Sequence, residues 1–227
     1  VRAALATGIF ETDLDTGESS VLVEPANGYT LLLPTWSPDG RFISFDELVY
    51  MEGRGPFTYY DFEAGKYIAW GDPLGNYDWS PDGETLAYDL LSYAPTGSER
   101  VFTRPRANQG GEVQVSPETQ QGYSFYPVYS PNGTQLAYLN NPGGPESTQH
   151  TLVVQELASG EIRELGSYES VWYLEWSPDG KALLFSAGPY DAQQVYGYDL
   201  TRGEAVVLAE GGQQTLVSAA LHPQVTA

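Results

Sequence analysis

The sequence predicts an all-β fold, a five-bladed β-propeller of four-stranded antiparallel blades. Three observations predict it: a turn containing proline and glycine recurs along the chain, a second hairpin motif lies between its copies, and no segment has the pattern of a long helix. The prolines of the first turn are 43, 50 and 47 residues apart, and spacings in the forties are typical of a four-stranded blade. Because the repeats cover nearly the whole chain, we expect a single domain over residues 1–227.

The first repeated motif is an aromatic residue followed by Ser-Pro-Asp-Gly, with Asn in place of Asp in the third copy. Proline presets φ at the second position of a type I turn, and glycine takes the positive φ that follows. We assign structural roles to the repeated positions, which are Trp36, Pro38, Gly40, Trp79, Pro81, Gly83, Tyr129, Pro131, Gly133, Trp176, Pro178 and Gly180. The three tryptophans recur in register and are therefore expected in the core.

The second repeated motif is an acidic hairpin of the form Asp-Leu-x-x-Gly-Glu. Its copies begin at Asp13, Asp61, Glu156 and Asp199. In the second repeat, a longer loop from Arg104 to Gly111 takes its place.

The two motifs divide the chain into blades. These cover residues 25–70, 71–118, 119–168 and 169–210, with a closing blade made from residues 1–24 and 211–227. Pairing of the terminal strands would leave no exposed sheet edge, which favours a closed ring. The alternative is a fragment of a six-bladed ring whose remaining repeat lies outside this chain.

Composition restricts the partners. The chain has 30 acidic and 10 basic residues, a net charge of −20 and no cysteine. Such a surface repels phosphate backbones, so we expect no nucleic acid partner. No apolar run reaches the ~20 residues of a membrane-spanning helix. The abundance of glycine, proline and tyrosine favours an exported protein, located outside the cell, in the periplasm or at the cell surface.

The Trp-Ser-Pro-Asp-Gly turn, the strand Thr85-Leu86-Ala87-Tyr88 and the acidic hairpin together resemble the TolB-type propeller repeat, a WD-like repeat. The resemblance implies a propeller and leaves the function open. Similar repeats occur in TolB, in propeller domains of prolyl-oligopeptidase-like and tricorn-like peptidases, and in bacterial surface proteins. TolB has six blades and an extra N-terminal domain, whereas five repeats are found here, so the role of TolB itself is not transferred.

Catalytic and metal motifs are weak. The sequence has no Gly-x-Ser-x-Gly elbow, and its two histidines, His150 and His222, fall in an expected exposed loop and a turn. The segment Asp13–Glu18 superficially resembles a calcium loop but lacks the third acid and the distant glutamate. We therefore expect no cofactor, with calcium as the remaining alternative.

Two carboxylates occupy equivalent positions. Asp78 and Glu175 each precede the repeated tryptophan, in the second and fourth blades. If they face each other across the channel, they are candidates for the acid and base of a carbohydrate-active hydrolase. If they do not, they point between blades or cap a polar channel mouth.

Aromatic residues are the other candidates for binding. Tyr126 lies before the third inner strand, and Trp172 and Tyr173 lie before the fourth. Tyr and Trp are enriched at interfaces. Together with Asp78 and Glu175 they are candidate contacts for another protein, a peptide or a carbohydrate; packing between blades is the alternative. We hypothesise a non-enzymatic interaction or scaffold propeller of a bacterial cell-envelope or extracellular assembly. A hydrolase with channel carboxylates and the propeller domain of a larger prolyl-oligopeptidase-like peptidase remain as alternatives.

Overall fold

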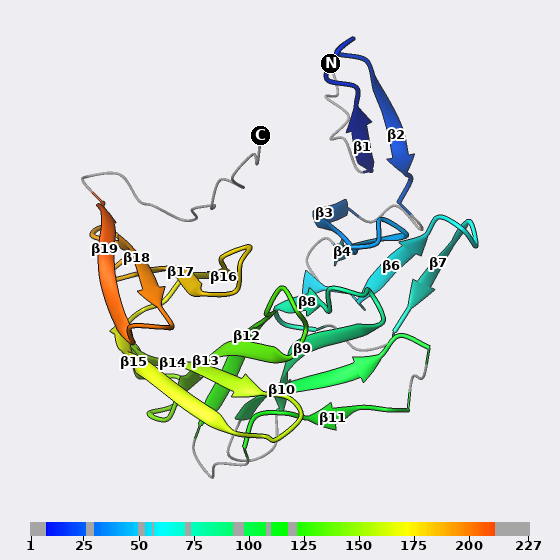
Figure 1. Cartoon of the computed structure of the whole chain (residues 1–227). Coiled ribbons are helices and arrows are strands. Elements are labelled where there is room, and N and C mark those ends of the chain that lie inside the picture. The colour runs from blue at the N-terminus through cyan, green and yellow to red at the C-terminus, as the bar shows by residue number, and fades with distance from the viewer. Residues whose placement is uncertain are drawn as a thin grey trace. The chain divides into compact units, whose positions relative to one another are not determined.

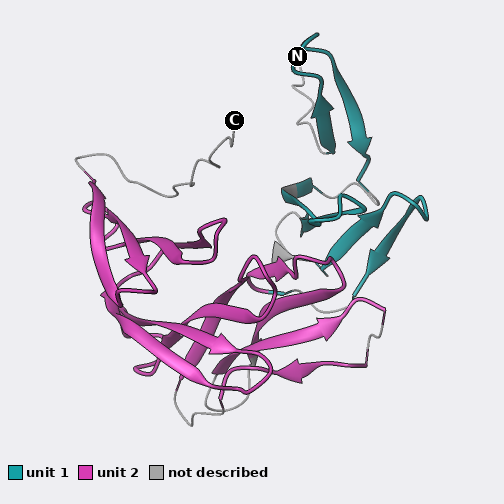
Figure 2. Ribbon diagram, viewed as in Figure 1, with its two compact units in different colours: residues 1–74 teal, residues 75–227 magenta. Residues whose placement is uncertain are grey.

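The chain folds into antiparallel β-sheets connected by turns and loops, as given by a computed structural model (Figure 1). The structure describes residues 8–25, 30–49, 53–55, 57–70, 74–92, 98–107, 110–117 and 122–211. These residues contain no helix, and so none that is long and apolar enough to cross a bilayer. The chain divides into two compact units, residues 1–74 and 75–227 (Figure 2).

The first unit holds a hairpin and a sheet. The hairpin pairs β1 (Ile9–Thr12) with β2 (Ser19–Val23). The sheet has the order β3 (Thr30–Trp36), β4 (Phe42–Val49), β6 (Thr58–Asp61) and β7 (Lys66–Ala69), and the short β5 (Gly53–Arg54) pairs with β4. Ile9 and Val23 of the hairpin share an apolar cluster with Phe45 of the sheet. Hairpin and sheet are therefore one hydrophobic unit.

The second unit contains three successive four-stranded sets. The first is β8 (Tyr77–Trp79), β9 (Thr85–Ser92), β10 (Ser98–Pro105) and β11 (Val113–Gln114); the second is β12 (Tyr123–Tyr129), β13 (Gln135–Asn141), β14 (Gln149–Glu156) and β15 (Ile162–Glu169); the third is β16 (Tyr173–Trp176), β17 (Ala182–Ala187), β18 (Gln194–Asp199) and β19 (Glu204–Glu210). Neighbouring strands within each set pair antiparallel. The first two sets are also joined by a parallel pairing of Glu99 with Tyr123.

The four ranges expected for the blades, 25–70, 71–118, 119–168 and 169–210, stay predictions. The sheet within the first range has five strands when β5 is included, and β15 ends at Glu169, one residue beyond the third range. The strand expected to complete a fifth blade falls in residues 212–227, outside the described part of the chain. The count of five blades and their closure therefore stay predictions.

The Ser-Pro turns have the predicted backbone conformation. The glycine φ is +69° at Gly40, Gly83 and Gly180 and +71° at Gly133. In each turn the serine hydroxyl donates a hydrogen bond of 2.6 to 2.8 Å to the aspartate or asparagine two residues later. This local chemistry turns the chain in the same way in every set.

The repeated tryptophans differ in burial. Trp79 and Trp176 are 3% and 5% exposed, in agreement with the prediction, and the Trp176 indole N–H donates to the Val128 carbonyl of β12 at 3.1 Å. The prediction of a core position for Trp36 is wrong, because this side chain is 47% exposed. Phe62 stacks on one face of the Trp36 indole, with ring centroids 5.2 Å apart, and this contact leaves close to half of the side chain accessible.

Candidate functional site

Asp78 lies in β8 with its carboxylate directed at β12 of the next set. Its Oδ2 accepts the backbone N–H of Tyr129 at 2.7 Å. Burial raises the pKa of Asp78 to about 6, against the opposing effect of the N–H groups of Tyr129 and Trp79. Glu175 has no part in this shift. Asp78 therefore connects two sets of strands. Its carboxyl group is bonded to backbone N–H groups, whereas that of Glu175 is bonded to the Tyr173 hydroxyl.

Asp89 of β9 is a second carboxylate at the same junction, and the sequence did not single it out. It is completely buried. Its Oδ1 accepts the backbone N–H of Asn76 at 2.9 Å, and its Oδ2 accepts the Asn76 side-chain amide at 3.0 Å and the Tyr126 N–H at 2.8 Å. One sequence signal points to it: the first repeat also has an acid, Asp46, at this strand position, whereas the later repeats have Leu139 and Ser186.

Glu99 of β10 is hydrogen-bonded to the Asp89 carboxyl group. Burial, together with the charge of Asp89, raises the pKa of Glu99 to about 7. Two carboxyl groups hydrogen-bond to each other only if one carries a proton. The guanidinium of neighbouring Arg100 donates to the backbone carbonyls of Glu99, at 2.8 Å, and of Gly122. The pair therefore holds a proton up to near-neutral pH.

Three of the predicted site residues come together between β12 and β16. Tyr126 lies in a bulge of β12 with a φ of +60°, a region that non-glycine residues rarely occupy. The Tyr173 hydroxyl donates to the carboxylate of Glu175. Burial and then Glu175 raise the pKa of Tyr173, and Tyr126 adds a smaller effect of the same sign. Tyr126, Tyr173 and Glu175 thus form one partly buried cluster.

Trp172 lies apart from this cluster, on a connection at one end of the third set. Its side chain is 44% exposed and contacts Tyr190, which is 66% exposed, with ring centroids 6.1 Å apart. The Trp172 indole N–H donates to the Gly188 carbonyl at 3.0 Å, and its backbone N–H donates to Ser186 at 2.9 Å. Both aromatic side chains are therefore exposed, and the tryptophan is held in place by hydrogen bonds.

His150 is in β14, so the prediction of an exposed loop is wrong. Its Nδ1 accepts the Val171 N–H at 3.1 Å, and its ring meets Phe125 edge-on. Burial lowers the pKa of His150. Within the described ranges no three His, Asp or Glu side chains converge on a position for a metal ion, and His222 lies outside these ranges. The histidine that the structure describes is thus used in packing.

Two comparisons, with family models and with curated proteins, concern the sequence. No family model matches the chain. A stretch of 105 residues is 28% identical to dipeptidyl-peptidase 5 of Porphyromonas gingivalis, and this match covers 44% of the chain and 15% of the peptidase. The chain therefore corresponds to a small part of that relative.

Solved structures resemble a much larger part of the chain. An oligogalacturonate lyase in complex with manganese has a TM-score of 0.70 at 15% identity, over 90% of this chain and 60% of the lyase. TolB from Acinetobacter baumannii gives 0.65 at 18% identity, over 90% of this chain and 49% of TolB. A prolyl endopeptidase gives 0.67 at 15% identity, over 93% of this chain and 34% of the endopeptidase. At these identities the likeness shows the fold alone, which is that of a β-propeller.

Proposed function

We propose that this chain is a β-propeller that recognises a protein or peptide and performs no catalysis itself. The observation that carries the proposal is the exposed aromatic pair of Trp172 and Tyr190. Tryptophan and tyrosine contribute large contact areas at little entropic cost, and they dominate binding energies at protein interfaces. The hydrogen bonds from Trp172 to the carbonyls of Gly188 and Ser186 fix this tryptophan before a partner arrives, which lowers the cost of binding.

The carboxylates support binding over catalysis. Asp78 and Asp89 accept backbone N–H groups of β12, and Glu175 accepts the Tyr173 hydroxyl. A glycosidase needs two carboxyl groups that flank one bond of a substrate. These carboxyl groups instead join strands and side chains of the protein, which is a structural use.

We further propose an exported location, in a cell-envelope or extracellular assembly. The net charge of −20 and the absence of cysteine are compatible with such a surface. This location is a proposal from composition, and fractionation of the source cells would test it.

The binding proposal is tested with a random 12-residue peptide library displayed on phage and selected on the purified chain. Enriched peptides are synthesised, and their Kd is measured by calorimetry for the wild type, Trp172→Ala and Trp36→Ala. Removal of a hot-spot tryptophan is expected to weaken binding about 30-fold. Trp36, with a similar exposure of 47%, is the matched control and is expected to have no effect. Peptides that bind Trp172→Ala as tightly as wild type would exclude this surface, and cleavage of the peptides by the chain would exclude a purely binding role.

A second candidate is the propeller domain of a longer peptidase. The match to dipeptidyl-peptidase 5, of which the chain covers 15%, favours it. Sequencing of the source gene on both sides of these 227 residues tests this candidate. A flanking domain with a Gly-x-Ser-x-Gly elbow is the expected result if it is right, and stop and start codons close to both ends would contradict it.

A further inference from the structure

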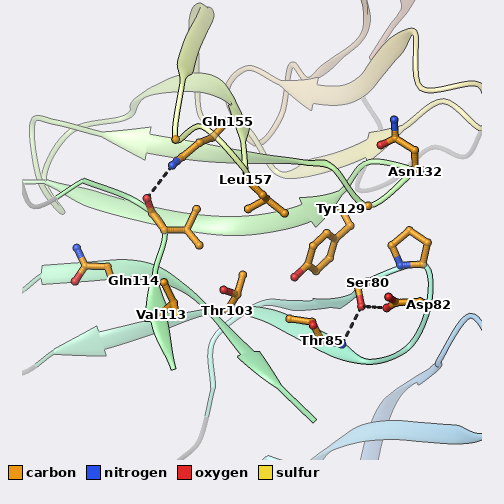
Figure 3. Close-up of a pocket in the computed structure, with 14 residues that line it drawn as sticks. Ser80, Asp82, Thr85, Thr103, Val113, Gln114, Tyr129, Asn132, Gln155 and Leu157 are labelled. Atoms are coloured by element: carbon orange, nitrogen blue, oxygen red, sulfur yellow. Dashed lines mark hydrogen bonds between the residues drawn. The ribbon is translucent and has the colours of Figure 1, made fainter. Parts of the chain in front are cut away.

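A groove of about 560 Å³ lies between the first and second sets of the second unit, β8–β11 and β12–β15 (Figure 3). This volume falls within the range of small-ligand sites. The turns at Pro81 and Asn132 form one wall, and a Cβ at Gly133 would lie 3.3 Å from Pro81, so the two turns pack against each other. Val113 of β11 and Leu157 after β14 line the remainder. The groove is separate from the Trp172 surface.

The groove results from a departure from the repeat. A loop replaces the acidic hairpin after Arg104, and β11 is reduced to two residues, whereas β15 has eight and β19 has seven. With so short an outer strand, Gln155 and Leu157 of the following set line an open space. The equivalent groove between the turns at Asn132 and Asp179 has a volume of only about 260 Å³.

The floor of the groove carries a polar group without a partner. Tyr129 occupies the repeat position that holds Trp79 and Trp176 in the neighbouring sets. The residue is only 8% exposed, and its hydroxyl has no hydrogen-bond partner in the described parts of the chain. Figure 3 shows the ring between Leu157 and Thr103 with the hydroxyl pointing into the hollow. A hydroxyl that opens onto a groove in this way can donate a hydrogen bond to a ligand that supplies an acceptor.

The rim of the groove carries a negative charge. Asp82 accepts the Ser80 hydroxyl at 2.6 Å and the Glu84 N–H at 3.0 Å, and these bonds lower the pKa of Asp82. The described lining contains no basic residue. Arg106, close by, is paired with Glu84 at 2.9 Å. With the chain at a net charge of −20, the groove repels anions and attracts a cationic group.

We propose that this groove binds an extended peptide that carries a lysine or arginine side chain. Tyr129 donates to a carbonyl group of the peptide, Asp82 accepts the basic side chain, and Val113 and Leu157 contact aliphatic groups. The short β11 ends the sheet at the groove, and an extended peptide can add to such an edge. A sugar fits less well, because sugars stack on an open aromatic face and the Tyr129 ring is buried, with only its hydroxyl directed at the space.

The test uses two arrays of hexapeptides with blocked ends. Lysine is fixed at the third position of every peptide in one array and glutamate in the other, and the remaining five positions are randomised. The purified chain is expected to bind the lysine array only. A selected peptide is then titrated by calorimetry. Asp82→Asn is expected to weaken binding about 10-fold or more, because it removes a hydrogen bond between charged groups. Tyr129→Phe is expected to weaken binding about 2- to 10-fold, because it removes a hydrogen bond between neutral groups. Asp179→Asn removes the same charge from the equivalent turn outside the groove and is expected to change Kd less than about twofold.

The variants are chosen so that the fold survives. Asn132 occupies the position of Asp82 in the third turn and accepts its serine hydroxyl at 2.8 Å, so asparagine at position 82 preserves the turn. Phenylalanine at position 129 keeps the ring. The proposal is overturned if neither array binds, if the selected peptide binds both groove variants as tightly as wild type, or if the chain binds a glycan array and no peptide.

Discussion

The backbone N–H of Tyr126 donates a hydrogen bond of 2.8 Å to the completely buried carboxylate of Asp89. The two residues are 37 positions apart and belong to successive sets of strands. Asp78 and Tyr129 form a parallel link of 2.7 Å at the same junction. A buried carboxylate is stable only when donors surround it, and each of these two acids takes one of its donors from the backbone of the neighbouring set. The junction therefore depends on two acids as well as on apolar packing.

Asp89→Asn is expected to lower the free energy of unfolding by about 3 kcal/mol. An amide nitrogen replaces one acceptor oxygen, and at least one of the three donors that face Asp89 loses a charge-assisted bond inside the protein. Urea unfolding measures the loss. Asp179→Asn, at an exposed turn, is the matched control and should leave the free energy of unfolding nearly unchanged. Equal losses for the two variants would contradict a special role of Asp89.

The stability of the chain is expected to fall as the pH rises from about 4.5 to 7. The folded-state pKa of Glu99 is raised from 4.5 to about 7, and that of Asp78 from 3.8 to about 6. The folded protein therefore binds these protons more tightly, and the resulting stability is complete below the unfolded pKa values and disappears as the pH passes the folded ones. Each pKa unit corresponds to about 1.4 kcal/mol.

Opposite shifts act at lower pH. The pKa values of Asp82 and Asp179 are lowered by hydrogen bonds in their turns, so their contribution is lost as the pH falls through the folded values. The melting temperature should therefore be highest near pH 4 to 5. Glu99→Gln keeps a hydrogen-bond donor for Asp89 and removes the carboxyl group that titrates. In this variant the decline in melting temperature toward pH 7 should therefore be smaller. An unchanged pH profile in this variant would exclude Glu99 as its source.

The turn glycines give a graded prediction. Gly83 has a φ of +69°, and a non-glycine residue in this region costs about 1–2 kcal/mol. Asparagine tolerates the conformation best and valine least. The free energy of unfolding should therefore decrease in the order Gly83, Gly83→Asn, Gly83→Ala, Gly83→Val, as measured in urea. A valine variant as stable as the asparagine variant would refute the role assigned to this turn.

The sequence was sufficient for the features that depend on local chemistry. Proline and glycine at fixed offsets define the turns, and alternation defines the strands that follow, so the four sets were predictable. The environment of Asp89 was not predictable, because one of its hydrogen-bond donors is the backbone N–H of Tyr126, 37 residues away. Trp36 shows the same limit, because the sequence places it in the repeat while its exposure depends on what packs against it. The groove arises where the repeat fails, and its shape depends on the neighbouring set.

Closure of the ring by the two ends of the chain gives the last prediction. The hairpin β1–β2 has only two strands in its sheet, and an isolated hairpin is marginal in water. If residues 212–227 supply its inner strand, their deletion should speed hydrogen exchange in residues 9–23 at least tenfold, because the open state becomes more populated. Peptides from β13 and β14 are the control, since their strands pair with neighbours on both sides. Deletion of Ile9 and its hairpin is less informative, because it also removes apolar contacts with Phe45. Unchanged exchange in residues 9–23 after the C-terminal deletion would contradict closure by these segments and favour a ring completed by another part of a longer chain.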